Sequence, residues 1–267
     1  MTLTDQDRVE ARASALSAGQ RKPALDVRQV SKRHGVGRDG VLALDRIDLT
    51  VQRGEFVCLV GASGCGKTTL LSLIAGLDQP TTGELQVNGR TALMFQEAAL
   101  LPWRTAVQNV ELALKLSGIP RRERHERALG LLQLVRLADF ADKAPHELSG
   151  GMRQRVALAR ALAQDAEILL MDEPFGALDA ITRDVLHDEI ERIAQEQHLT
   201  VLFVTHNVRE ASRLGDRIVL LSSRPGRVVE EFGVPVERPR RIESPEVSAI
   251  AATVMTQLRE EVRRHAR

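Results

Sequence analysis

The chain has 267 residues, of which 43% are hydrophobic, a composition that supports a folded core in one large α/β domain. Its 37 Lys and Arg residues balance 36 Asp and Glu residues, so the net charge of +1 excludes the basic excess typical of general nucleic-acid-binding proteins. The 2 cysteines are too few for a disulfide framework, and no apolar run approaches the roughly 18 residues of a transmembrane helix, which together favour a cytoplasmic protein.

The first part of the chain predicts strands followed by a helix. Residues 1–23 have no continuous hydrophobic segment after basic residues, so we expect a loose leader rather than a secretory signal. Residues 25–33 and 41–51 alternate apolar and polar side chains, which predicts two antiparallel strands joined by a turn. Residues 55–61 are a continuous apolar run, typical of a strand that is buried on both faces, and a helix is expected over 67–75.

The rest of the chain combines apolar residues at helical spacing, which predict helices, with continuous apolar runs, which predict buried strands. A helical stripe of Ile181, Val185, Ile190 and Ile193 is expected to mark one of the helices. In chain order we expect a short strand over 83–89, helical structure over 105–136, a helix over 150–163, a strand over 167–173, a helix around 181–193, a strand over 200–206, a helix over 207–214 and strands near 217–222 and 227–232.

The order of these elements indicates the fold class. Antiparallel strands come first, and strand–helix alternation follows with an all-helical insertion. This order predicts a three-layer α/β core that carries an antiparallel β-subdomain and an inserted helical subdomain at about 105–163. The main domain is expected to span 24–235, and residues 236–267 to form a Pro- and Arg-rich linker with a helical C-terminal tail.

The strongest motif is GASGCGKT at 61–68, which fits the phosphate-loop pattern G-x-x-x-x-G-K-[ST] between a buried strand and a helix. Glycines let the backbone wrap closely around phosphate groups with its N–H groups pointing inward. Lys67 is expected to reach the β- and γ-phosphates of a nucleotide, and the Thr68 hydroxyl to bind Mg²⁺. The alternative is a glycine-rich turn that happens to carry a lysine. The predicted nucleotide-binding residues of this loop are Gly61, Ala62, Ser63, Gly64, Cys65, Gly66, Lys67, Thr68 and Thr69.

Polar residues end the other strands that are predicted to lie beside the phosphate loop. After the run ILLM, Asp172 is predicted to hold Mg²⁺ and Glu173 to polarise an attacking water. His206 is predicted to sense the γ-phosphate, and Gln96, after TALMF, to contact Mg²⁺ or water. Strand ends on one edge of a parallel sheet form the ligand crevice. The alternatives are that the two acids only cap the following turn and that His206 is structural.

A second candidate phosphate loop opens the stretch LSGGMRQRVALARAL at 148–162. Ser149, Gly150 and Gly151 directly precede the run that predicts a helix, and the bare N–H groups of a helix start form an anion site. One nucleotide does not need two phosphate loops from a single chain, so this second loop requires an explanation of its own.

Six motifs occur in the order of an ABC-type ATPase, and the chain resembles that family over about residues 25–235. The motifs are GASGCGKT, MFQE, LSGGMRQRVALARAL, ILLMDEP, GALD and VTH. The resemblance implies a P-loop NTPase fold, ATP and Mg²⁺ as cofactors, and two ATPase subunits, expected to be identical, paired head to tail. Each ATP then lies between the phosphate loop of one subunit and the Ser-Gly-Gly loop of the other. Ser149, Gly150 and Gly151 would serve the partner's nucleotide, and Asp179 in GALD is implied to be a dimer contact.

A finer resemblance indicates the importer branch. Residues 99–110 and 220–232 are similar to the ATPases of bacterial nitrate, sulfonate and taurine uptake systems, although these stretches are less specific than the six motifs. This implies a membrane permease and a periplasmic or lipid-anchored substrate-binding protein as partners, no nucleic-acid partner, and a peripheral position on the cytoplasmic face of the inner membrane. The segment 96–104 is implied to meet a short helix of the permease, with Trp103 as a surface contact; the alternative places Trp103 in the core.

Two other functions and one departure from the family pattern stay open. A soluble ABC ATPase of DNA repair or translation usually carries long coiled-coil insertions or two cassettes, and this chain has neither. A nucleotide-binding regulator without turnover would not need Glu173 and His206. The aromatic residue that stacks on adenine in the family, commonly Tyr, aligns here with His34, and the chain contains 0 tyrosines. His34 is therefore predicted to stack on the base with a smaller ring.

Overall fold

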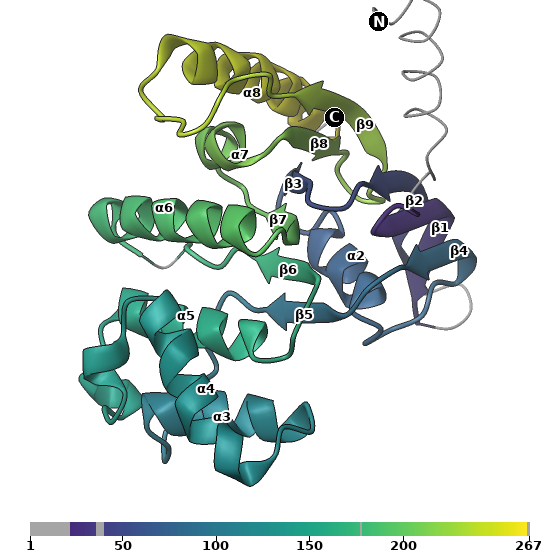
Figure 1. Cartoon of the computed structure of the whole chain (residues 1–267). Coiled ribbons are helices and arrows are strands. Elements are labelled where there is room, and N and C mark those ends of the chain that lie inside the picture. Colours follow the sequence, from purple (N-terminus) through teal and green to yellow (C-terminus); the bar gives the residue numbers. More distant parts are fainter. Residues whose placement is uncertain (1–21, 36–39, 177, 266–267) are drawn as a thin grey trace, which may run out of the picture.

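The computed structural model describes residues 22–35, 40–176 and 178–265 of the chain (Figure 1). A six-stranded sheet in the order β5-β6-β7-β3-β8-β9 runs through the centre of the molecule. Neighbouring strands from β5 to β8 are parallel, and the edge strand β9 is antiparallel to β8. These strands are β3 (Phe56–Val60), β5 (Thr91–Met94), β6 (Ile168–Asp172), β7 (Thr200–Val204), β8 (Arg217–Leu221) and β9 (Val228–Gly233).

A smaller antiparallel sheet of order β2-β1-β4 lies beside the central sheet (Figure 1). The predicted pair of antiparallel strands at the start of the main domain is confirmed, because β1 pairs with β2, and β4 joins the other edge of β1. The remaining elements are β1 (Leu25–His34), β2 (Val41–Val51), β4 (Thr82–Val87), α2 (Lys67–Ile74), α3 (Ala106–Leu116), α4 (Arg121–Leu134), α5 (Gly150–Leu162), α6 (Ala180–Glu196), α7 (Val208–Leu214) and α8 (Pro245–His265).

The side chains of β3 show that the central sheet is covered on both faces. Phe56, Cys58 and Val60 belong to a core that includes residues of α6 and α7, whereas Val57 and Leu59 belong to a second core with α2 and β2. Successive side chains of a strand point to opposite faces, so each face of β3 serves one core. All five residues are buried, which explains the continuous apolar run, and the predicted three-layer α/β core is confirmed.

Helices α3, α4 and α5 form a lobe next to the edge strand β5 (Figure 1). The helical pattern predicted over 105–136 is two helices, because Gly118 adopts a φ of 82° and Pro120 stands directly before α4. Thr105 begins α3 with a capping box: its side chain accepts a hydrogen bond from the backbone N–H of Gln108, and the Gln108 side-chain oxygen accepts one from the backbone N–H of Thr105.

The helix predicted around 181–193 is confirmed as α6, but only two of the four apolar residues that mark it in the sequence are buried. Ile190 and Ile193 are buried, but Ile181 and Val185 are 79% and 42% exposed. The buried stripe of α6 instead runs through Leu186, Ile190 and Ile193, at helical spacing. At 3.6 residues per turn, Ile181 and Val185 lie about 140° and 100° around the helix from Leu186, so they point away from the core.

The C-terminal segment returns to the central domain. Beyond β9 the chain leads to α8, which packs beside α7 (Figure 1). The stretch predicted as a linker is anchored there, because Arg238 donates hydrogen bonds to Leu214 O at 2.5 Å and to Asp216 Oδ1 at 2.7 Å. Within the described part of the chain, α8 included, the helices are too short or too polar to cross a membrane.

Candidate active site

The phosphate loop follows the end of β3 and leads into α2, as the sequence predicts. Gly64 and Gly66 have φ values of 73° and 101°, which L side chains rarely adopt. A Cβ atom at Gly66 would lie 2.6 Å from Leu44 Cδ2 and 2.8 Å from Ala43 O. Glycine at this position therefore lets the loop lie directly against β2, and the strand, loop and helix that the motif requires are all present.

The lysine of the motif lies inside the loop. Lys67 is 6% exposed, and its Nζ donates hydrogen bonds to the carbonyl oxygens of Gly61 and Ala62, both at 2.9 Å. An ammonium group has three donors and almost never lies buried unless it is paired. These contacts hold the positive charge of Lys67 against the loop backbone, where a phosphate bound by the loop would meet it.

A cavity of about 430 Å³ opens beside the loop. Most of the residues predicted to bind nucleotide line it, and Glu173 lies on its wall, whereas Gly61, Ala62 and Cys65 do not line it. The lining also contains Arg224, which the sequence analysis did not single out beyond its place in the stretch 220–232. The described lining residues are His34, Val41, Ala43, Ser63, Gly64, Gly66, Lys67, Thr68, Thr69, Glu173 and Arg224.

Oxygen ligands suited to Mg²⁺ meet at the end of β6. Burial raises the pKa of the Asp172 carboxyl, which also accepts a hydrogen bond from the Thr68 side chain. Within the described chain no three His, Cys, Asp or Glu residues form a metal site. Mg²⁺ usually takes only one or two carboxylates and completes its shell with water and substrate phosphates. A hydroxyl beside one carboxylate therefore fits Mg²⁺.

The other predicted Mg²⁺ ligand, Gln96, lies near the same strand ends. A Cβ atom built on Gly176 would stand 3.5 Å from Gln96 Nε2 and 3.9 Å from Glu173 Oε2. Both side chains thus border Gly176, in the turn that follows β6.

Glu173 and His206 are paired at the ends of two neighbouring strands. His206 Nδ1 lies 2.9 Å from Glu173 Oε2, and the backbone N–H of Glu173 donates to Val204 O at 2.9 Å. Strands β6 and β7 are adjacent and parallel, so their C-terminal ends meet at one edge. The carboxylates of Asp172 and Glu173 are directed to Thr68 and His206.

A buried polar network lies behind His206. Glu210 accepts a hydrogen bond from the hydroxyl of Thr205, and its other oxygen lies 2.6 Å from His187 Nε2. Thr205 in turn accepts from the backbone N–H of Asn207 at 3.0 Å. The network fixes the backbone on both sides of His206. The sequence alone does not predict this network. Its one signal in the sequence is the presence of polar residues at helix positions that the structure shows to be buried.

Replacing Glu210 with Ala is expected to lower the free energy of unfolding by about 3 kcal/mol, because two buried donors lose their acceptor. It should also lower ATP turnover, since the strand end that carries His206 loses its support. Urea denaturation measures the first effect. Glu196→Ala is the control, because Glu196 forms an exposed ion pair with Arg192 and should change stability by less than about 1 kcal/mol. Equal, small effects of the two substitutions would contradict a supporting role for Glu210.

The second glycine-containing loop begins α5 and does not reach this cavity. Ser149 caps the helix, with its Oγ accepting a hydrogen bond from the N–H of Met152 at 3.2 Å. A Cβ atom at Gly151 would lie 2.3 Å from Thr182 Cγ2 of α6, so helix packing within the chain also requires glycine there. The residues at 149–151 are absent from the described lining of the cavity, and α5 lies apart from α2 (Figure 1).

Asp179, implied by the family resemblance to be a dimer contact, has a role within its own chain. Its side chain caps α6 by accepting a hydrogen bond from the N–H of Thr182 at 3.0 Å. That backbone N–H holds the pKa of the Asp179 carboxyl below its ordinary value. A contact across a dimer stays a prediction.

Known proteins resemble this chain closely. The ABC transporter family model matches residues 44–176. The chain is 47% identical over 242 residues to the aliphatic sulfonates import ATP-binding protein SsuB 1 of Mesorhizobium japonicum, a match that covers 88% of each chain. The chain belongs to the ABC transporter family.

Two more ABC transporter proteins define the branch. The chain is 46% identical to the taurine import ATP-binding protein TauB of Rhizobium johnstonii, covering 84% of this chain and 88% of that protein. It is 48% identical to the nitrate import ATP-binding protein NrtD of Synechocystis sp., covering 74% and 78%. The predicted resemblance to the nitrate, sulfonate and taurine branch is confirmed. None of these relatives supports the alternative of an ABC ATPase unconnected with transport.

A solved structure of similar fold is also an ATP-binding cassette. A dimeric structure of the post-hydrolysis state of the ATP-binding cassette MJ0796, bound to ADP and Pi, matches with a TM-score of 0.70 at 34% identity. The match covers 80% of this chain and 100% of that one. The predicted P-loop NTPase fold is confirmed, and the chain is an ATP-binding, ATP-hydrolysing subunit of an ABC transporter.

The ABC subunit links the neighbourhood of Gln96 to the helical lobe. Gln154 Nε2 of α5 donates to Gln96 O at 2.7 Å. Two turns further along α5, Arg160 donates to the carbonyl oxygens of Ala98 and Ala99, each at 2.7 Å. The helix that starts at Ser149 therefore holds the segment that follows Gln96.

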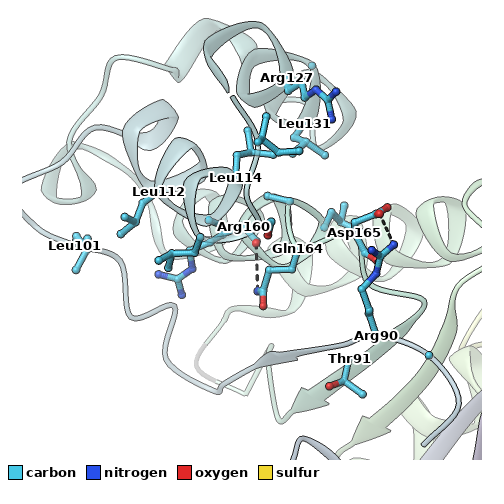
Figure 2. A pocket seen from close by; sticks show the side chains of 18 residues that line it. Arg90, Thr91, Leu101, Leu112, Leu114, Arg127, Leu131, Arg160, Gln164 and Asp165 are labelled. Atoms are coloured by element: carbon cyan, nitrogen blue, oxygen red, sulfur yellow. Dashed lines mark hydrogen bonds and ion pairs between the residues drawn. The ribbon is translucent and has the colours of Figure 1, made fainter. Parts of the chain in front are cut away.

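The largest of the cavities described here, about 1140 Å³, lies between this segment, the helical lobe and the start of β5 (Figure 2). Leu101, Leu112 and Leu131 give it apolar walls, and Arg160 also lines it (Figure 2). Beside it, buried Asn109 accepts a hydrogen bond from Leu101 N at 2.8 Å and donates to Thr105 O at 2.9 Å. This tight turn presents Trp103 to solvent at 75% exposure, so the alternative that places Trp103 in the core is wrong.

Proposed function

We propose that this chain energises a bacterial importer of a small oxyanion, such as a sulfonate, taurine or nitrate. The observation that carries the proposal is the meeting of the phosphate loop, the Asp172 and Glu173 carboxylates and His206 at one sheet edge, in a chain whose relatives are import proteins. The solutes named for those relatives carry a sulfonate group or are nitrate. They differ from one another, so the proposal names a chemical class and not one solute.

The residues of the site divide the reaction among them. The phosphate loop holds the ATP phosphates with its N–H groups and Lys67. Thr68, Gln96 and Asp172 would hold Mg²⁺, which neutralises charge on the phosphates when it is bound. Glu173 orients the attacking water and accepts its proton. His206 stays oriented by its 2.9 Å contact with Glu173 and by the network at Thr205, so that it meets the γ-phosphate.

A second copy of the chain completes each site. Ser149, Gly150 and Gly151 offer a hydroxyl, backbone N–H groups and the positive end of α5 to the ATP held by the partner. Two observations support this arrangement: these residues lie outside the described lining of their own cavity, and the cassette of similar fold was solved as a dimer. Asp179 lies beside this surface as a second dimer contact.

The permease binds in the groove between 98–104 and the helical lobe (Figure 2). Its leucine walls suit the apolar face of a short helix. Contacts of α5 with Gln96, Ala98 and Ala99 connect this groove to the ATP site. The subunit thus acts as a peripheral protein at the cytoplasmic face of the inner membrane, and a substrate-binding protein delivers the solute from the other side.

Reconstitution tests the proposed function. The chain would be purified with the permease encoded beside it, placed in liposomes, and supplied with the adjacent substrate-binding protein and radiolabelled taurine, an alkanesulfonate or nitrate. We expect uptake of one of these solutes only with ATP, and ATPase activity that rises with the loaded binding protein. An ATPase indifferent to the permease and the binding protein would contradict the importer assignment.

Replacing Trp103 with Ala is expected to leave the fold and the ATPase of the isolated subunit largely unchanged and to weaken permease-coupled transport severalfold. An exposed aromatic residue is a frequent anchor of an interface. Uptake and ATPase rates in the same liposomes measure the coupling. Leu77→Ala is the matched control, because Leu77 is also exposed, at 65%, but lies outside the segment 96–104 that is proposed to meet the permease. Loss of folding in the Trp103 variant would contradict its surface role.

Substitution of His34 tests the adenine contact. His34→Tyr is expected to tighten ATP binding and His34→Ala to weaken it, each by several-fold, because stacking on a base is worth about 1–3 kcal/mol. Discrimination against GTP should be poor in the wild type, since a stacking ring reads few features of the base. Equilibrium affinities for ATP and GTP measure these effects. Equal affinities of all three proteins would show that His34 does not touch the base.

A further inference from the structure

The hairpin between β8 and β9 reaches the cavity beside the phosphate loop, because its residue Arg224 lines that cavity. Gly226, in its tip, donates a hydrogen bond to Ala43 O at 2.8 Å and accepts one from Asp45 N at 2.9 Å. A Cβ atom on Gly226 would lie 2.2 Å from the carbonyl oxygen of Cys65 in the phosphate loop. The hairpin is therefore fixed to β2 and to the phosphate loop together.

Bonds within the hairpin hold its shape. The Ser222 Oγ accepts a hydrogen bond from the N–H of Arg227 at 2.9 Å, and its single hydrogen is shared between the carbonyl oxygens of Ser223 and Pro225, which lie at 2.9 and 2.8 Å. The guanidinium of Arg227 pairs with Asp45 of β2. One serine thus contacts three backbone groups of the turn. Arg224 stands between Ser223 and Pro225, so these contacts fix the backbone from which its side chain extends.

Arg224 extends from this turn to the phosphate loop. Its Nε donates to Gly64 O at 3.4 Å, and its side chain lines the cavity with His34 and Ser63. The described lining of the cavity contains one lysine, Lys67, one arginine, Arg224, and one acidic residue, Glu173. A guanidinium carries five N–H donors in a rigid plane, which suits it to phosphate oxygens better than an ammonium group.

We propose that Arg224 binds the phosphate groups of the nucleotide, so that the β8–β9 hairpin forms part of the ATP site. The inference rests on the proposed assignment of this cavity to ATP. ATP brings up to four negative charges to a cavity in which Lys67 is already bound to two carbonyl oxygens of its own loop. The Arg224 guanidinium beside Gly64 is a second cation, which increases the attraction of the cavity for the phosphate groups. A hydrogen bond between guanidinium and phosphate is charge-assisted on both sides.

Calorimetric titration of the full chain with ATP, ADP and AMP tests the inference. Arg224→Ala is expected to raise the Kd for ATP by about tenfold, the Kd for ADP by less and the Kd for AMP least, because each phosphate removed takes away an acceptor. Arg224→Lys should lie between the Ala variant and the wild type. Arg227→Ala is the matched control: it removes the same charge from the same hairpin, but Arg227 pairs with Asp45 and does not line the described cavity, so ATP affinity should stay within about twofold.

Each other result has one meaning. Wild-type affinity in Arg224→Ala would overturn the inference, and an equal loss for ATP, ADP and AMP would place the guanidinium on the adenosine instead of the phosphates. Lys67→Ala, measured alongside, distinguishes a failure of the role given to Arg224 from a failure of the assignment of the cavity to ATP. If it binds ATP like the wild type, the assignment of the cavity itself fails. If Arg224→Ala loses its cooperative thermal transition, the shorter, neutral and polar Arg224→Gln replaces it, with the same order of ATP, ADP and AMP expected.

Discussion

Glu173→Gln is expected to leave ATP binding nearly intact and to lower ATP turnover by about 10²–10⁴-fold, the usual contribution of a general base. The amide keeps the size of the carboxylate and a polar group toward His206 Nδ1, so the turn after β6 should hold its shape. It cannot accept a proton from water as the γ-phosphoryl group leaves. The phosphate loop and Asp172 do not depend on Glu173, so the variant should accumulate as an ATP-bound dimer.

The measurement is ATP affinity together with steady-state turnover in the permease complex, with size-exclusion chromatography for the dimer. Glu167→Gln is the control: this residue stands just before β6, at the opposite end of the strand, and pairs with Arg53 at 2.8 Å on the surface. Its turnover should match the wild type. Hydrolysis by Glu173→Gln at near the wild-type rate would mean that Glu173 is not the base and that another group, such as His206, accepts the proton.

The elements that position this site were predictable because each carries a strong local signal. The phosphate loop has glycines at positions of positive φ, and β3, β6 and β7 are apolar apart from Asp172 at the end of β6 and Thr200 at the start of β7, because both faces of the sheet are covered. The ends of such strands must meet at one edge, which brings Asp172 and Glu173 of one motif together with His206 of another. Local pattern and topology agree here, so sequence reasoning was sufficient.

Contacts between elements distant in the sequence were not predictable in the same way. His187 and Glu210 come from different helices, and only their packing makes them partners. Arg224 reaches Gly64 across 160 residues because the β8–β9 hairpin folds onto β2. The spacing of Ile181 and Val185 was compatible with a helix, but the direction of the buried stripe is set by the sheet beneath α6. Tertiary packing decides such features.

Ser149→Arg is expected to abolish most ATP hydrolysis while leaving ATP binding by single subunits nearly unchanged. In the proposed dimer, a bulky cation at the start of α5 would occupy the space of the partner's phosphates and remove the hydroxyl proposed to bind them. The substitution also removes the cap that Ser149 gives to Met152 N, which costs about 1 kcal/mol of stability. Thr105→Ala is the control for this loss, since it removes the cap of α3 in the same lobe and leaves the ATP site alone.

Mixing variants decides whether the serine acts on the partner's ATP. In a mixed dimer of Ser149→Arg and Lys67→Ala subunits, one composite site combines both defects. The other combines the intact phosphate loop of the first subunit with the intact Ser-Gly-Gly loop of the second. If Ser149 serves the partner's nucleotide, this mixture should recover hydrolysis that neither variant shows alone, provided that one intact site suffices for turnover. If Ser149 serves the nucleotide of its own subunit, each site carries one defect and mixing restores nothing.

The assay is the ATPase activity of the mixture, measured over a range of protein concentrations. A site shared between two subunits predicts a rate per subunit that rises with concentration as dimers form. A constant rate per subunit, with no recovery on mixing, would rule the shared site out.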